Sequence, residues 1–233
     1  MSAFVIPDTH GCLKTLIFLL ECKLQVSRSD TLYMLGDYID RGSKSAELVE
    51  YLINLKESGY YVHYLKGNHE KMLLDSFQSN NYYKLWMYNS GDSTLESYSR
   101  MLKIDPNEMC LNDIPEKHIL FFKSLPTHEI LQDKYILVHG GLDFRQKDPF
   151  ADEETLLWKR PEFLPDWFLP KKVVIHGHTP ISIEHVLEGV DKPVNRLINL
   201  DAGCVYKGIW PGTGYLTALN LDSWEITYIK NLD

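Results

Sequence analysis

Aspartate, histidine and asparagine side chains gather in four short stretches that follow one another along the 233-residue chain. The stretches are Asp8-Thr9-His10-Gly11, Gly36-Asp37-Tyr38-Ile39-Asp40-Arg41-Gly42, Gly67-Asn68-His69-Glu70, and His139-Gly140-Gly141 with the later His176-Gly177-His178. Carboxylate, imidazole and amide donors without cysteine suit Mn, Fe, Zn or Mg. Two such ions about 3.5–4 Å apart can activate water and stabilise an in-line displacement at phosphorus. At average residue usage, Gly-Asn-His-Glu alone would arise by chance in roughly one such chain in a thousand. We therefore interpret the stretches as one dinuclear site.

The order of residue types within the stretches suggests how two ions could be held. Asp8 and His10 are two residues apart at the end of an extended segment, so both can face one ion. The Asp37 carboxylate has two oxygens and can bridge two ions. Asn68 offers a neutral amide oxygen, and His139 and His178 offer imidazole nitrogens.

Strands and helices alternate around the first three stretches. Short apolar runs at 4–6, 31–35 and 60–65 predict buried strands, each ending just before one of the stretches. Residues 12–24 have helical periodicity, and Ser43 can cap a second helix over about 44–58. This alternation predicts a mainly parallel sheet, and α/β sheets place ligands at the carboxyl ends of their strands.

The middle of the chain changes character. It is aromatic and helical in pattern, and Ser93-Thr94-Leu95-Glu96 fits a helix capping box. We expect a helical cap inserted at about 72–127, whose aromatic residues form its own core rather than a ligand cage. Strands are expected again at 135–138 and 172–175. Further segments at 183–187, 196–200, 215–219 and 225–229 are expected as antiparallel strands of a second sheet.

Composition limits the class of protein. Apolar residues make up 44% and charged residues 24%, which is ordinary for one globular α/β domain of 233 residues. A net charge of −8 argues against a basic nucleic-acid-binding face. The four cysteines, Cys12, Cys22, Cys110 and Cys204, have no metal-ribbon spacing and are expected to be reduced thiols in the cytoplasm. No signal peptide or membrane-spanning stretch is expected.

The four stretches together resemble those of calcineurin-like metallophosphoesterases, of the phosphoprotein-phosphatase (Ser/Thr protein phosphatase) type found in bacteria. The resemblance runs from Phe4 to about Tyr228 and is weak between about Phe77 and Thr127. It implies an α/β (α+β) fold in which a two-sheet β-sandwich is flanked by helices, as one domain over 1–233 with the helical cap inserted. It also implies two divalent metal ions, with Mn²⁺ preferred and Fe, Zn or Mg as alternatives.

The resemblance assigns roles to individual residues. One metal takes Asp8, His10 and Asp37, and the other takes Asp37, Asn68, His139 and His178. His69 is the general acid, a task for which imidazole is well matched, and Asp40 orients it. The role of His176 is open, because the family's Gly-His-x-His motif reads Gly-His-Thr-Pro in this chain. We favour a core or supporting histidine over a ligand.

Arginine is the residue best suited to bind phosphate, because its planar guanidinium pairs with two oxygens at once. Arg41 lies inside the second stretch, and Arg160 lies in Trp158-Lys159-Arg160, which resembles a Trp-x-Arg element of bacterial members. Asn68 is a further candidate for the phosphate. Glu70 is expected either to close a turn or to pair with Arg41.

The expected function is hydrolysis of phosphomonoesters by attack of a metal-bridging hydroxide. The preferred substrate is a phosphoserine or phosphothreonine protein, or another small phosphoester. A symmetrical dinucleoside polyphosphate (diadenosine tetraphosphate) hydrolase shares these motifs and is the alternative. A non-catalytic scaffold is a third reading, which the complete set of expected ligands argues against. The pattern leaves the substrate, the native metal, the oligomeric state and the task of the helical cap open.

Overall fold

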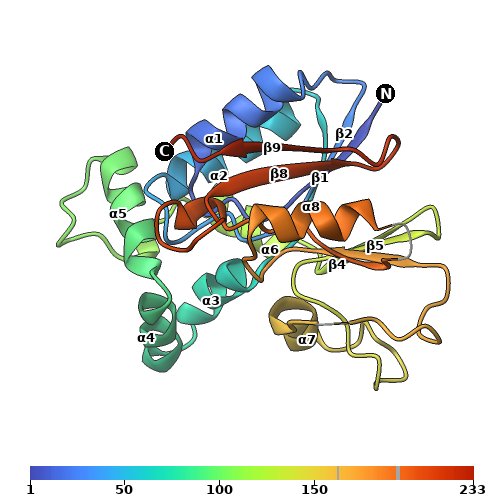
Figure 1. Cartoon of the computed structure of the whole chain (residues 1–233). Helices are drawn as coiled ribbons and strands as arrows, with labels where there is room; N and C mark the ends of the chain where they lie inside the picture. The colour runs from blue at the N-terminus through green and yellow to red at the C-terminus, as the bar shows by residue number, and fades with distance from the viewer. Residues whose placement is uncertain (162, 193–194) are drawn as a thin grey trace.

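The computed structural model describes residues 1–161, 163–192 and 195–233, and its strands form two sheets (Figure 1). The first sheet has the order β3-β2-β1-β8-β9. Strands β1 (Ala3–Ile6), β2 (Thr31–Met34) and β3 (Tyr61–Tyr64) run parallel, which confirms the alternating start of the chain. Strands β8 (Tyr215–Asn220) and β9 (Ile226–Lys230) extend the sheet beyond β1 in antiparallel pairing.

The second sheet has the order β4-β5-β6-β7. Strand β4 (His128–Leu131) is antiparallel to β5 (Tyr135–Val138), and β6 (Val173–His176) and β7 (Leu197–Asn199) continue in parallel. Two expectations about this sheet were wrong. The segments at 215–219 and 225–229 are strands of the first sheet, and the segment at 196–200 pairs in parallel. An apolar run predicts a strand but does not specify the edge to which it is added.

The segment at 183–187 is helical, contrary to the strand expected there. It begins helix α8 (Ile183–Asp191), where the Ser182 hydroxyl accepts the backbone N–H of His185 at 3.4 Å as a helix cap. Ile183, Val186 and Val190 are the buried residues of this helix. Their spacing of three and four residues defines one face of a helix, which a five-residue window is too short to distinguish from a strand.

Apolar side chains alternate between the two faces of each sheet. In β1, Phe4 and Ile6 pack into one core with α1 and α2, while Val5 packs into a second core between the sheets. In β5, Leu137 faces that shared core, and Ile136 and Val138 face a third cluster under α7. The period of two along a strand therefore produces a sandwich with helices on both outer faces.

Helices follow β1 and β2 as expected. Helix α1 (Leu13–Phe18) continues into a π-helical turn (Leu19–Lys23), and α2 (Ser45–Glu57) follows the second stretch. Ser43 is not the cap of α2, because the N-cap position is Lys44 and no side chain caps it. The Ser43 carbonyl instead accepts a hydrogen bond from the guanidinium of Arg100.

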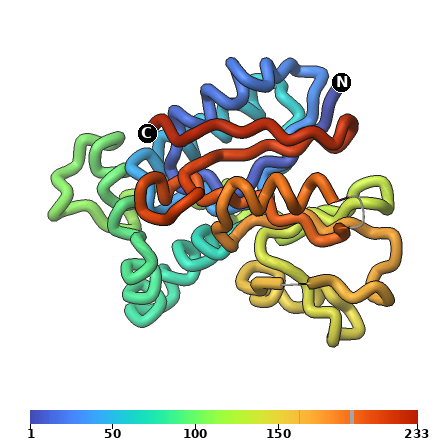
Figure 2. The backbone as a smooth tube through the Cα atoms, viewed as in Figure 1, coloured from blue at the N-terminus to red at the C-terminus, as the bar shows by residue number. Residues whose placement is uncertain are grey.

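The middle of the chain is helical, as expected. It holds α3 (Asn68–Ser76), α4 (Asn80–Tyr88), α5 (Gly91–Leu102), a 3₁₀ turn (Leu111–Asp113) and α6 (Glu116–Ser124). Figure 2 shows α4 and α5 projecting at one side of the molecule. The capping box expected at 93–96 was wrong, since α5 begins at Gly91 and these residues lie within the helix. Ser93 Oγ donates to the carbonyl of Ser90, and Thr94 is used elsewhere.

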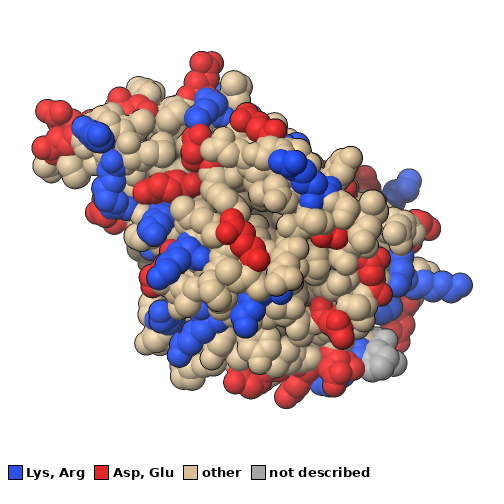
Figure 3. All heavy atoms as spheres, turned by 90° about the horizontal axis from the view of Figure 1, so that it is seen from above, with Lys and Arg blue, Asp and Glu red and all other residues tan. Residues whose placement is uncertain are grey.

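Acidic and basic side chains are intermixed on the face of the molecule seen in Figure 3. Neighbouring charges of opposite sign partly cancel, so this face presents a mixed field rather than one sign. None of the helices in the described part of the chain has the length and apolar character to cross a membrane.

Candidate active site

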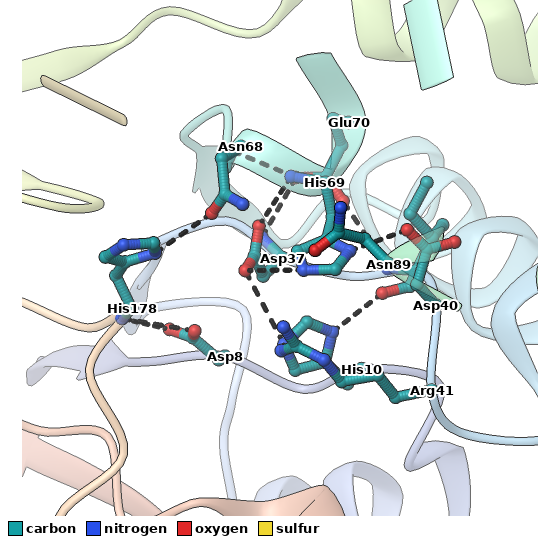
Figure 4. A network of polar contacts seen from close by, with 12 residues as sticks. Asp8, His10, Asp37, Asp40, Arg41, Asn68, His69, Glu70, Asn89 and His178 are labelled. Carbon is teal, nitrogen blue, oxygen red and sulfur yellow. Dashed lines mark hydrogen bonds and ion pairs between the residues drawn. The ribbon is translucent and has the colours of Figure 1, made fainter. Parts of the chain in front are cut away.

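The polar stretches meet where the carboxyl ends of the parallel strands of both sheets come together. Asp8 follows β1, Asp37 follows β2, and Asn68 opens α3 just after β3. His139 follows β5 and His178 follows β6, which brings them in from the second sheet. All five side chains are buried. Figure 4 shows the labelled members of this set converging on Asp37 from different elements.

Two groups of donor atoms share Asp37. His10, Asp37 and His69 each offer an atom within 4.8 Å of the others, and Asp37, His139 and His178 do the same. Asp37 Oδ2 lies 3.3 Å from His139 Nε2, 3.5 Å from His10 Nε2 and 3.9 Å from His69 Nε2. Asp37 Oδ1 accepts the backbone N–H of His69 at 3.0 Å. A single carboxylate oxygen therefore faces both groups, rather than one oxygen facing each.

Backbone hydrogen bonds aim two of the imidazoles. His10 Nδ1 donates to the Ile39 carbonyl at 2.7 Å, and His139 Nδ1 donates to the Leu35 carbonyl at 3.0 Å. In each neutral ring this leaves the Nε2 lone pair pointing into the site. The Nε2 lone pair of His139 faces Asn68 Oδ1 at 2.9 Å and also faces Asp37 Oδ2. Three hydrogen-bond acceptors therefore point at one another. Such a cluster requires a proton or a cation at its centre, and the residues therefore fit a metal site.

The charges in the site are crowded. Burial would lower the pKa of His139, but the carboxylates of Asp37 and Asp8 raise it to about 9. Burial acts to raise the pKa of Asp37, yet the neighbouring imidazoles of His139 and His69 hold it well below its usual range. A metal cation would replace the proton that His139 attracts in this arrangement.

Asp8 is placed beside the two groups rather than in either of them. Both of its carboxylate oxygens accept the backbone N–H of His178, at 3.0 and 3.1 Å, and Oδ1 lies 4.0 Å from His139 Nδ1. A side chain at Gly177 would collide with Asp8 Oδ1, so glycine is required for this approach. Burial raises the pKa of Asp8 to about 7. Its assignment as a ligand stays a prediction.

His69 and Asp40 form a buried pair. His69 Nδ1 lies 2.6 Å from Asp40 Oδ2, and His69 Nε2 is buried without a hydrogen-bond partner among the described residues. Asp40 also accepts the indole N–H of Trp86 at 2.9 Å and the hydroxyl of Thr94 at 2.6 Å. Three donors therefore fix the carboxylate that orients the imidazole.

Trp86 and Thr94 are site residues that the sequence did not reveal. The pattern placed Trp86 among core aromatics and Thr94 in a helix cap. The one available signal was weak: a buried indole needs an acceptor for its N–H. The two donors lie 46 and 54 residues from Asp40 in the chain, so no local spacing could link them.

Replacing Thr94 with Val tests this support. The variant is expected to lower turnover about tenfold with little change in metal content, because Asp40 loses a buried hydrogen bond and His69 loses its fixed orientation. Stability should fall by about 1–3 kcal/mol, as measured by urea denaturation. Ser93→Ala is the matched control, since Ser93 Oγ donates to the carbonyl of Ser90, the residue before α5, rather than to Asp40. Equal turnover in both variants would contradict the role.

Glu70 closes the turns of the second and third stretches. Its carboxylate accepts the backbone N–H groups of Asp37 at 2.9 Å, Tyr38 at 2.8 Å and Gly67 at 2.9 Å. These contacts give Glu70 the turn-closing role, which is one of the two roles expected for it. Gly67 is required here because a side chain would collide with Asp37 Oδ1. Burial raises the pKa of Glu70 to about 7.

Each candidate phosphate-binding arginine lies beside a different donor group. The Arg41 guanidinium contacts His10 Nε2, and Arg160 Nε lies 3.5 Å from His178 Nε2. A phosphate between the two groups would therefore have a guanidinium near either end.

His176 lies outside both groups; its Nδ1 contacts the Gly177 carbonyl at 3.0 Å, and burial lowers its pKa to about 4.

Part of the backbone strain in the described chain lies in the site. Left-handed φ angles, which side chains other than glycine rarely adopt, occur at His10 (41°), Asp37 (52°), Asp40 (69°), Arg41 (67°) and His178 (67°). Each costs on the order of 1–3 kcal/mol, and the surrounding hydrogen bonds hold it in place. Such clusters are typical of functional sites, where side-chain direction takes precedence over backbone preference.

Comparison with known proteins identifies the family. Residues 1–208 match the family described as calcineurin-like phosphoesterase. A relative from Bacillus velezensis, named asymmetrical bis(5'-nucleosyl)-tetraphosphatase PrpE, is 28% identical over 88% of this chain and 86% of its own. The protein of that name from Bacillus subtilis is 26% identical over 88% and 87%.

Solved structures share the fold at lower identity. A protein serine/threonine phosphatase from Saccharomyces cerevisiae has a TM-score of 0.65 and 20% identity, covering 100% of this chain and 81% of its own. A metallophosphoesterase from Sphaerobacter thermophilus has a TM-score of 0.54 and 18% identity, covering 99% and 88%. With the family match and the two-sheet architecture, these comparisons show that the chain belongs to the calcineurin-like phosphoesterases, a family of divalent-metal-dependent phosphoester hydrolases.

Proposed function

We propose that the protein hydrolyses phosphate ester or anhydride bonds with two divalent ions, natively Mn²⁺, which Asp37 would help to hold as the residue shared by the two donor groups. The observation that carries this proposal is the convergence of three imidazole nitrogens on one buried oxygen, Asp37 Oδ2, at 3.3–3.9 Å. His10 with Asp8 would hold one ion, and His139, His178 and Asn68 the other. The chemistry supplied by the bound pair is polarisation of the phosphoryl group and activation of water.

His69 is proposed to give its proton to the leaving oxygen. Its Nδ1 is fixed by Asp40 at 2.6 Å, so the other nitrogen, Nε2, is directed toward the centre of the site. That nitrogen is buried and has no hydrogen-bond partner in the described structure, which leaves it free for the substrate. A donor placed in this way acts on the departing group and needs no movement of its own.

We propose one domain over 1–233, with the helices at about 72–127 as an insertion that supports the site. Trp86 and Thr94 come from that insertion and hold Asp40. We also propose a cytoplasmic location, which is supported by four cysteines that are all free thiols: Cys12, Cys22, Cys110 and Cys204.

Arg160 is proposed as the second phosphate-binding residue, together with Arg41. A charge-assisted hydrogen bond to phosphate contributes about 1.5–3 kcal/mol, so Arg160→Ala should lower kcat/KM by roughly ten- to a hundredfold. Arg160→Lys should restore only part of it, because an ammonium cannot make the bidentate contact. Competitive inhibition by inorganic phosphate should weaken in parallel. Arg28→Ala serves as the control, since Arg28 lies over Tyr60. An unaltered phosphate inhibition constant would remove Arg160 from the site.

The proposed substrate is a dinucleoside tetraphosphate, cleaved asymmetrically. This reverses the preference that the sequence suggested, and it is supported by relatives of that name at up to 28% identity along most of the chain. A phosphoserine or phosphothreonine protein is the second candidate. The serine/threonine phosphatase with a TM-score of 0.65 shares the fold, but at 20% identity it says nothing about the substrate.

A substrate panel tests the choice. Mn²⁺-loaded protein is incubated with diadenosine tetraphosphate and with phosphoserine peptides, and products are separated by ion-exchange chromatography. ATP with AMP is expected from the dinucleotide, whereas two ADP would show symmetrical cleavage. Faster release of phosphate from the peptides would favour the second candidate. No turnover of either, nor of a small aryl phosphate, would show a non-catalytic scaffold.

A further inference from the structure

Two aromatic rings are stacked beside the site, one at the end of the 3₁₀ turn Cys204–Tyr206 and one on the loop that follows it. The rings of Tyr206 and Trp210 have centroids 4.1 Å apart and planes inclined by only 19°. Tyr206 is half-buried, but Trp210 is 47% exposed and its neighbour Ile209 is 65% exposed. Exposed apolar side chains grouped on one loop at the edge of a site are typical of ligand contacts.

Direct contacts connect this stack to the candidate metal centre. His10 touches the Arg41 guanidinium, and Arg41 Cζ lies 5.5 Å from the centroid of the Tyr206 ring. The Tyr206 ring is therefore in contact both with Arg41 and with the exposed Trp210 ring. These contacts run from His10 in the donor group to Arg41, from Arg41 to Tyr206, and from Tyr206 to the exposed Trp210. A phosphate held by Arg41 would therefore lie close to these two rings.

The loop is held in one conformation by its own hydrogen bonds. Thr213 Oγ1 donates to the carbonyls of Tyr206 at 3.1 Å and Trp210 at 2.9 Å, and Ile209 N–H donates to Tyr206 at 3.0 Å. Gly214 N–H donates to Ala202 at 3.1 Å. A preformed aromatic surface loses little conformational entropy when a flat ligand stacks on it.

We propose that Tyr206 and Trp210 form a stacking platform for the base of a nucleoside polyphosphate whose phosphates contact Arg41. This inference rests on the proposed function and specifies how a nucleoside end of the substrate is recognised. The polyphosphate chain together with a ribose would connect the phosphate at Arg41 to a base on the exposed face of Trp210. Stacking tolerates any base, because every base has a flat π face. The platform therefore predicts selection for nucleosides with little discrimination between adenine and guanine.

The test compares Trp210→Ala, Trp210→Phe and Tyr61→Ala in the full, Mn²⁺-loaded chain. Loss of one stacked base should raise KM for diadenosine tetraphosphate roughly five- to a hundredfold, with a small change in kcat. Phe should retain most of the affinity. Tyr61 is an exposed aromatic residue at the start of β3, whereas the site lies beyond the end of that strand. Tyr61→Ala therefore controls for the loss of a surface ring. Thermal melting checks that each variant is folded.

Inhibition of aryl phosphate hydrolysis measures the contribution of the base to binding separately from that of the phosphates. ATP and inorganic tripolyphosphate carry the same number of phosphates, but only ATP has a base to stack. In Trp210→Ala the inhibition constant of ATP should rise by the same factor as KM, and that of tripolyphosphate should stay within about twofold. An unchanged constant for ATP, or equal rises for both inhibitors, would overturn the platform.

The two proposals can fail separately. If the wild-type protein hydrolyses diadenosine tetraphosphate but Trp210→Ala leaves KM unchanged, only the platform is wrong. If the wild-type protein does not hydrolyse the dinucleotide, the proposed substrate is wrong. The ATP to tripolyphosphate comparison then still decides whether Trp210 binds a base.

Discussion

Replacing His69 with Asn is expected to reduce turnover of a substrate with a poor leaving group, such as phosphoserine, by roughly 10²–10⁴-fold. The leaving alkoxide needs a proton, and His69 Nε2 is the buried, unpartnered nitrogen that can supply it. An aryl phosphate with an activated leaving group needs less protonation, so its loss should be clearly smaller. Both rates are measured by phosphate release from the same enzyme preparation.

Metal content distinguishes this role from ligation. His69 lies within 4.8 Å of the donor atoms of His10 and Asp37, so the structure alone would also allow it to bind an ion. A general acid can be removed with both metals retained after dialysis, whereas removal of a ligand lowers the metal content. Equal losses on the two substrates with full metal would contradict proton donation. Loss of one metal would make His69 a ligand instead.

Asp40→Asn provides the matched variant for the pair. An amide keeps the shape of the carboxylate but can no longer stabilise a positive charge on the ring, so it should reproduce part of the His69 defect. The network beneath it explains why the carboxylate is fixed: Trp86 and Thr94 both donate to it. These donors make the pair a rigid unit rather than an exposed catalytic dyad.

The sequence predicted the centre of this site because parallel strands end at one edge of a sheet. Asp8, Asp37 and Asn68 each follow one of three short apolar runs, and pairing those strands necessarily brings the three side chains together. His139 and His178 follow from the same argument applied to the second sheet. Local pattern was sufficient there because the strand itself carries the residue to the site.

The pattern was insufficient where partners depend on pairing at long range. Strands β8 and β9 were recognised as strands but assigned to the wrong sheet, because an alternating segment fits any free edge. The segment of α8 was taken as a strand because its three buried residues are too few to define a period. Trp86 and Thr94, which donate to Asp40, were missed because their contact is long-range. Only the folded chain places α4 and α5 beside the second stretch.

The left-handed backbone of the site could not be predicted either. Five site residues adopt positive φ without glycine, and local preference opposes every one of them. The reason is visible at Asp37, where Glu70 binds the backbone N–H at 2.9 Å and thereby sets the direction of the carboxylate. Side-chain geometry at the candidate metal site is thus held by contacts between stretches, and no single stretch contains that information.

Asp37→Asn is expected to lower the occupancy of both metal sites, whereas Asp8→Asn should affect mainly one. Asp37 Oδ2 faces His139 at 3.3 Å and His10 at 3.5 Å, so it alone is shared between the two donor groups. A change beside a metal typically weakens binding by ten- to a hundredfold, and loss of a shared ligand charge should weaken both sites at least that much.

The measurement is metal per protein by elemental analysis after dialysis against a weak chelator. Asp75→Asn is the control, because Asp75 lies on α3 and pairs with Lys71 at 2.8 Å, outside both donor groups. Activity should fall in parallel with the metal in Asp37→Asn and remain near wild type in Asp75→Asn. Two metals retained at full occupancy in Asp37→Asn would show that the two groups bind independently and that Asp37 is not a shared ligand.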